Sequence, residues 1–263
     1  MNATTVSKTH LIRAGSVIGI LVVWQVLIGV LQVIPAYLVP PPTDVLDALV
    51  TLLQTNDFLE HIRITATRVF WASLIASIPG IIIGLAMGWS RTIKALIFPI
   101  VGATYPLPKI ALLPLLMLVL GVGEGAFIGT AALASTFLVM FNSMRGVSEI
   151  GDLYFDVAKD NGVDSPYTYF TEILLPGALP MIFTGLRLTL NTTLLIVISI
   201  EFIAARQGLG AFIWTRWSTL QTAQMYAAIL VVSVGGIFIT YGLAWFADHA
   251  IPWKPAAGGV SAE

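Results

Sequence analysis

Charged and polar side chains gather in one stretch of an otherwise apolar sequence, residues 156–180, which reads DVAKDNGVDSPYTYFTEILLPGALP. Five of its residues are charged: Asp156, Lys159, Asp160, Asp164 and Glu172. Apolar residues recur at positions 150, 153, 154, 157 and 158, a spacing that predicts an amphipathic helix. No nucleophile is paired with a base, and no His/Asp/Glu set lies within the apolar runs. We therefore expect this stretch to dock another protein rather than to catalyse a reaction.

Two short helices that meet at a glycine are the expected structure of this polar stretch. Ser148 can cap the first helix, and Gly162 can end it in the left-handed conformation. Ser165 can cap the second helix with Pro166 at its first position, and Pro176 is expected to stop it. Both helices are too short to span a membrane, and the small residues at the corner allow another protein to approach the backbone.

The rest of the sequence has the composition of a membrane protein. Hydrophobic residues make up 57% and charged residues 10%, against roughly 25% charged in ordinary globular chains, and the mean hydropathy is +0.90. A spanning helix needs about 20 mostly apolar residues. Six runs meet this length, at about 14–34, 64–89, 96–120, 125–144, 178–204 and 225–248. We predict an all-α integral membrane protein with about six transmembrane helices, the polar stretch lying between spans four and five.

Composition also excludes several functions. The net charge of −1 leaves no basic face for nucleic acid, and the absence of cysteine excludes disulfides and thiolate metal sites. His10, His61 and His249 lie far apart without carboxylates at ligand spacing, so we expect no metal site. No G-x-x-x-x-G-K-S/T motif is present. The chain cannot bind ATP by the usual phosphate loop, and energy must come from a partner.

The distribution of Lys and Arg predicts that both termini are cytoplasmic. Seven of these residues then face the cytoplasm, and four lie in outer segments: Arg63, Arg68, Arg206 and Arg216. The apolar run 14–34 is longer than that of a signal peptide, so we expect a retained span, with a cleaved signal as the alternative. The predicted organisation is a cytoplasmic tail at 1–13, one transmembrane domain at 14–248 and a second cytoplasmic tail at 249–263.

A short interfacial helix is expected after the first span. A PPP run gives the chain a stiff, extended entry, and Thr43 or Asp44 can cap a helix there. Valine and leucine then recur at helical spacing over residues 45–53. This pattern favours a structural helix that packs on the spans.

The polar stretch resembles the cytoplasmic loop of the permeases of importer-type ATP-binding-cassette (ABC) transporters. The signature of that family is Glu-Ala-Ala followed by a Gly and, further on, Leu-Pro. Asp156 stands at the Glu position, and the other matching residues are Val157, Ala158, Gly162, Leu175 and Pro176. Asp156, Val157 and a slightly longer spacing before Leu-Pro depart from the signature, which leaves their effect on coupling open.

Three other segments are similar to the nitrate/sulfonate/taurine subfamily of these permeases. PLPKIALLPLLMLVLGVGEG (106–125) resembles its third span, residues 174–210 resemble its fifth span, and YLVPPPTDVLDAL resembles the segment after its first span. The resemblance covers residues 37–245 in order. It implies the importer permease fold, in which a helix-turn-helix at 148–176 inserts into a cytoplasmic ATPase subunit and couples its movements to the spans.

The resemblance also implies a function and its partners. The chain would be a permease without catalytic activity in a bacterial inner membrane, working with a second permease copy in a homodimer. A partner ATPase would bind ATP and Mg²⁺, and an extracytoplasmic solute-binding protein would deliver the solute. The expected solute is a small anion such as a sulfonate, taurine or nitrate, and the alternative is a neutral heterocyclic vitamin precursor.

Two other classes of function fit the sequence less well. An ion-coupled secondary transporter predicts inverted repeats and carboxylates within spans, and the sequence shows neither. An intramembrane enzyme needs a catalytic or metal-binding constellation at membrane depth, and we find none.

The third predicted span contains candidate residues for the translocation pathway or its gate. Pro106, Pro108 and Pro114 each remove a backbone donor, and broken backbone at membrane depth is tolerated only where protein covers it or where it lines a water-filled cavity. Lys109 lies among them, and a charge within the membrane suggests function. It could attract an anion, or it could be a structural lysine bonded to carbonyls that the prolines free.

The fifth predicted span contributes two more candidates for the pathway or gate, Arg187 and Glu201. They are fourteen residues apart, about four turns, so they share a face without touching. The resemblance places Glu201 at the outer gate, where it could pair across a dimer or meet the delivery protein. Pairing with another span is the expected role of Arg187.

Overall fold

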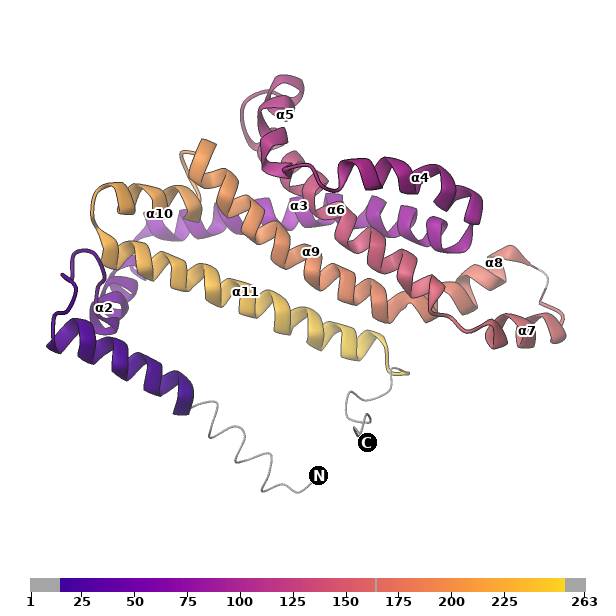
Figure 1. The fold of residues 1–263 in the computed structure, drawn as a ribbon, viewed down its shortest axis with the longest axis horizontal. Coiled ribbons are helices and arrows are strands. Elements are labelled where there is room, and N and C mark those ends of the chain that lie inside the picture. Colours follow the sequence, from indigo (N-terminus) through magenta and orange to yellow (C-terminus); the bar gives the residue numbers. More distant parts are fainter. Residues whose placement is uncertain (1–14, 164, 254–263) are drawn as a thin grey trace. The chain divides into compact units, whose positions relative to one another are not determined.

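The computed structural model describes residues 15–163 and 165–253, and every regular element in them is a helix (Figure 1). The predicted tail 1–13, and the predicted tail 249–263 from residue 254 on, lie outside the described residues. The chain forms two compact units. Of the described residues, the first unit comprises those up to 64 together with 205–233, and the second comprises the others.

Four helices in the described part of the chain are long and apolar enough to cross a membrane: α3 (Asn56–Trp89), α6 (Glu124–Ser148), the continuous helix Pro166–Ala204 and α11 (Thr222–Ala250). The predicted third span is not one straight helix. It is a pair, α4 (Arg91–Thr104) and the segment Lys109–Leu120, bent by 93° at the break. Counting the pair as one span gives five.

The first predicted span is present as the apolar helix Gly15–Val30, which is shorter than the four long helices. Its last turns are π-helical (η1, Gln25–Val30). The count of six spans therefore stays a prediction.

The first unit is held together by contacts between its two chain segments. Phe58 of α3 is fully buried against Phe212 of α10 (Leu209–Ser218), with ring centroids 4.9 Å apart. His61 Nδ1 accepts a hydrogen bond of 2.9 Å from the backbone N–H of Gly208, the residue that precedes α10. These contacts fix α10 against the start of α3 within this unit.

The short helix after the first span is α2 (Pro42–Leu53). Its N-cap is Pro41, and no side chain caps it. The prediction that Thr43 or Asp44 caps this helix is therefore wrong. Proline at the first helical position has a dihedral angle that already suits a helix, so the helix begins before either residue.

The second unit is built around α6, which packs between α3 and α9 (Leu175–Ala204). On the α3 side, glycines recur every four residues, at 80, 84 and 88. A Cβ on Gly80 would lie 2.5 Å from Val139 Cγ1, and one on Gly88 would lie 2.6 Å from Val147 Cβ. Small residues at this spacing allow membrane helices to approach closely, so this repeat sets the α3–α6 contact.

The α6–α9 contact combines close packing with hydrogen bonds. A Cβ on Gly185 of α9 would lie 3.0 Å from Val139 Cα. One turn further, Thr189 Oγ1 donates to the Ser135 carbonyl at 3.5 Å, and Thr193 Oγ1 lies 2.8 Å from Ser135 Oγ. The two helices therefore run antiparallel, with residues 135–139 of α6 beside residues 185–193 of α9.

Candidate functional site

The predicted docking segment begins later than its sequence suggests. Helix α6 continues through Ser148, whose Oγ donates to the Met144 carbonyl at 3.0 Å. The next helix, α7 (Asp152–Asp160), has Gly151 as its N-cap. The prediction that Ser148 caps this helix is wrong, because the hydroxyl bonds back within the preceding helix instead of forward.

Gly162 ends α7 as predicted. Its φ is +76°, in the region that favours glycine. Its N–H donates to the Lys159 carbonyl and the Val163 N–H to the Ala158 carbonyl, each at 3.0 Å. This pair of bonds is the Schellman arrangement of a helix C-terminus. No neighbouring heavy atom lies within 4 Å of the place where a Cβ on Gly162 would stand, so the corner is open to an approaching partner.

The second helix of the segment does not stop at Pro176. It begins at Pro166 after Ser165, as predicted, although the Ser165 side chain makes no capping bond. It then runs through α8 (Pro166–Thr168), η3 (Tyr169–Leu174) and α9 without a break. The turns of η3 are π-helical, and such wider turns absorb local disruptions of the α-helical bonding pattern. We attribute the continuity past Pro176 to these turns.

The surface of α7 is unusually apolar for an exposed helix. Leu153, Tyr154 and Val157 are exposed to 71%, 67% and 51%, and Asp156 is exposed beside them. Phe155 turns the other way and stacks on Tyr169, with centroids 6.3 Å apart. Helix α7 and the start of α8 project beyond the end of α6 (Figure 1).

Leu175 and Pro176 do not belong to that exposed surface. Leu175 packs against a buried cluster that includes Leu85, Val147 and Ala178, and Pro176 is half-buried. Their place in the structure is therefore at the root of the docking segment.

The prolines of the bent pair stand at helix boundaries. Pro108 precedes the short 3₁₀ helix η2 (Lys109–Leu112), and Pro114 is in the first turn of α5 (Leu113–Leu120), where its missing N–H has no partner to lose. Pro106 lies in the break itself. These residues delimit the 93° bend.

Lys109 is held at the bend by groups of its own chain. Its Nζ donates to the Tyr105 carbonyl at 3.0 Å. The same atom lies 4.7 Å from the centroid of the Tyr105 ring and 5.9 Å from that of Phe137 on α6, within the range of cation–π attraction. No described carboxylate forms a salt bridge with it.

Arg187 lies on the face of α9 that meets α11 within the second unit. One turn before it, Phe183 contacts Phe246, with centroids 5.9 Å apart. One turn after it, Asn191 Nδ2 donates to Thr240 Oγ1 at 3.0 Å. Arg187 itself is half-buried, its buried Nε has no hydrogen-bond partner, and no described residue pairs with its charge. The described chain does not provide the partner expected from the sequence.

Glu201 is fully buried and paired within the chain. Arg68 Nη1 donates to its Oε1 at 2.8 Å, and Thr65 Oγ1 lies 2.9 Å from each of its oxygens. Arg68 also donates from Nε to Glu124 Oε2 at 2.8 Å, and a second, shorter contact joins its Nη2 to Glu124 Oε1. These residues join α3, α6 and α9, and we name Thr65, Arg68, Glu124 and Glu201 the carboxylate–arginine cluster.

Sequence reasoning missed most of this cluster. The sequence places Arg68 in an outer segment, and the structure places it inside α3 with its side chain 4% exposed. The available signal was the i, i+3 spacing of Thr65 and Arg68, which places both on one face of a helix.

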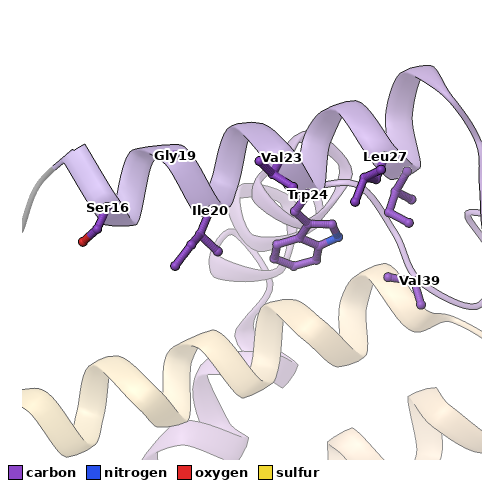
Figure 2. A pocket seen from close by; sticks show the side chains of 8 residues that line it. Ser16, Gly19, Ile20, Val23, Trp24, Leu27 and Val39 are labelled. Carbon is purple, nitrogen blue, oxygen red and sulfur yellow. The ribbon is translucent and has the colours of Figure 1, made fainter.

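An apolar groove of about 510 Å³ runs along the first helix of the first unit (Figure 2). It is lined by Ser16, Gly19, Ile20, Val23, Trp24, Leu27, Ile28 and Val39. No charged side chain lines it.

Comparison with known proteins gives one family. The family of binding-protein-dependent transport system inner membrane components matches residues 80–252. The taurine transport system permease protein TauC of Escherichia coli (strain K12) is 30% identical over 252 residues, covering 94% of this chain and 91% of that protein. The nitrate import permease protein NrtB of Synechocystis is 26% identical over 243 residues, covering 89% and 86%.

Two further similarities agree with this. A putative aliphatic sulfonates transport permease protein, SsuC of Bacillus subtilis (strain 168), is 28% identical over 217 residues, covering 82% of this chain and 78% of that protein. Among solved structures, an inward-facing MetNI methionine ABC transporter matches with a TM-score of 0.59 at 18% identity, covering 73% of this chain and 95% of that chain. The structural match supports the predicted importer permease fold.

Proposed function

This chain belongs to the family of binding-protein-dependent transport system inner membrane components, and from that premise we propose that it carries a small anion into a bacterial cell. The chain is a multi-pass permease subunit of an ABC importer rather than an enzyme. A sulfonate, taurine or nitrate is the proposed substrate, because relatives that align over most of this chain are named as permeases for these solutes.

The energy for transport comes, in this proposal, from an ATPase subunit that holds ATP and Mg²⁺ and docks on α7. The exposed apolar face of α7 is the observation that carries this assignment, because Leu153 and Val157 leave more than half of their surface uncovered on a helix with acidic neighbours. A partner protein would remove this apolar surface from water. The open corner at Gly162 would allow that partner to reach the backbone.

The remaining parts of the assembly belong to the same proposal. A solute-binding protein delivers the anion, and a second copy of the chain completes a homodimer around the pathway. Residues 14–248 act as one permease domain, both termini lie in the cytoplasm with α7, and the carboxylate–arginine cluster lies near the outer surface. We keep the bent pair, from Pro106 through Lys109 to Pro114, as part of the pathway or gate.

Co-purification from native membrane tests the partners directly. We expect mass spectrometry to identify an ATPase with a phosphate-loop motif and an extracytoplasmic binding protein bound to the chain. A chain that purifies alone and transports solute into liposomes without ATP would instead be a secondary transporter, and the proposal would be wrong.

A further inference from the structure

Lys109 and Arg187 occupy nearly the same depth in the second unit. Lys109 lies against Phe137 of α6, and Arg187 lies between Gly185 and Thr189 of α9. Because residues 135–139 of α6 pack beside residues 185–189 of α9, the two cations are within about one helical turn of each other in depth, which is about 5 Å.

No carboxylate on the described long helices of the second unit lies at that depth. The acidic residues in or beside the long helices of this unit stand near the helix ends: Glu124 and Glu201 at one end, and Glu149, Glu172 and Asp248 toward the other. Glu201 is fourteen residues from Arg187 along α9, about 20 Å in a helix. The helices that surround the two cations therefore offer them no negative charge.

A second copy of the chain does not change this balance. A homodimer with its axis along the membrane normal places the same residues at the same depth, so it doubles the number of cations and adds no carboxylate. Charges within a membrane are expensive and face a partner or a water-filled cavity. A mobile anion would supply the counter-charge that this layer lacks.

We propose that Lys109 and Arg187 form a cationic layer that attracts and holds the transported anion part-way across the membrane. This inference rests on the proposed function. Arg187 supplies a guanidinium with no partner among the described residues, a planar group suited to the oxygens of a sulfonate or nitrate. Lys109 supplies a second charge whose position is fixed by the Tyr105 carbonyl and two aromatic rings.

The layer would favour anions over neutral solutes of the same size. A cation in a low-dielectric surrounding raises the local concentration of anions. Its lack of a fixed carboxylate partner means that the anion need not displace an existing salt bridge on arrival. Each cation should bind the anion only weakly, because passage through a charged pore requires binding that is weak enough for the anion to leave.

The test uses the complete importer, with ATPase and binding protein, in liposomes, and radiolabelled taurine and nitrate as probes. We expect Arg187→Gln to reduce uptake of the transported anion by about tenfold to one hundredfold, the value of one or two charge-assisted hydrogen bonds. Arg187→Lys should retain a larger share, since it keeps the charge, and Lys109→Gln should reduce uptake as well. Arg63→Gln is the control, because Arg63 is an exposed cation paired with Glu60.

The readouts separate the layer from the proposed function. Co-purification with the ATPase and ATP hydrolysis should be unchanged in all four variants. Unchanged uptake in Arg187→Gln, or an equal loss in Arg187→Lys and Arg187→Gln with assembly retained, would overturn the cationic layer. If Arg187→Gln does not assemble, anion uptake by Arg187→Lys and Lys109→Gln tests the cationic layer instead, and unchanged uptake in Lys109→Gln would overturn it. A wild-type complex that carries neither nitrate nor a solute with a sulfonate group would overturn the proposed substrate as well.

Discussion

Arg68 and Glu201, which are 133 residues apart in sequence, form a buried ion pair between two long helices. Arg68 Nη1 lies 2.8 Å from Glu201 Oε1. Glu201 has no exposed surface, and the Arg68 side chain is 4% exposed. The Thr65 hydroxyl donates a hydrogen bond to the same carboxylate, and Glu124 accepts a hydrogen bond from Nε of the Arg68 guanidinium. The carboxylate–arginine cluster therefore fixes α3, α6 and α9 to one another at one end.

Removing only one charge of this pair should destabilise the protein strongly. Arg68→Gln leaves the Glu201 carboxylate buried without its counter-charge, which typically costs about 3–5 kcal/mol. Thermal unfolding of the purified protein in detergent should show a clearly lower midpoint than wild type.

Replacing both members by apolar residues provides the matched comparison. Arg68→Met combined with Glu201→Leu removes both charges, and well-packed apolar replacements of a buried pair are often neutral. We expect the double variant to recover most of the stability lost in Arg68→Gln. Equal midpoints for wild type and Arg68→Gln would show that the pair does not hold the helices together.

The glycine seam between α3 and α6 should not tolerate larger side chains. A Cβ on Gly84 would collide with the Met140 carbonyl and with Ser143 Cβ, so Gly84→Ala should lower stability by about 1–3 kcal/mol through overpacking. Gly242→Ala on α11 is the control, since no atom lies within 4 Å of its Cβ position. If both variants unfold at the wild-type midpoint, the close helix contact is wrong.

Gly162 should be needed for coupling rather than for folding. Gly162→Val forces a β-branched residue into a φ of +76°, which should distort the corner and separate ATP hydrolysis from uptake. Gly151→Val, at the N-cap of the same short helix, is a matched control, because Gly151 has a φ of −66° and open space around its Cβ position. Normal coupling ratios in Gly162→Val would remove the corner from the docking surface.

The exposed apolar face of α7 should be the contact for the ATPase. Val157→Asp places a charge on that face, and burying an unpaired charge in an interface is costly, so co-purification of the ATPase should be lost. Lys159→Gln, on the other side of the same helix, should leave co-purification intact. Retention of the ATPase by Val157→Asp would place the docking surface elsewhere.

Local sequence signals predicted some of these features and missed others for physical reasons. Gly162 was predictable because a helix end and a left-handed residue are both local properties. Pro176 was predicted wrongly as a helix stop, because its effect depends on the π-helical turns before it. The glycines at 80, 84 and 88 form a small-residue repeat in the sequence, from which a close helix contact could have been predicted.

The pairing of Arg68 with Glu201 could not be predicted in the same way. Each residue lies on a separate helix, and only the packing of three helices brings them together. The same applies to Arg187. That its Nε has no hydrogen-bond partner in the described chain could be recognised only once the contacts of its neighbours on α9 and α11 were known.

The most direct test of the central claim is anion uptake by the reconstituted importer as a function of ATP. Liposomes containing this chain and its ATPase, supplied with the binding protein, should accumulate radiolabelled taurine or nitrate only when ATP is present on the side of α7. Uptake that proceeds equally without ATP, or without the ATPase, would contradict the account.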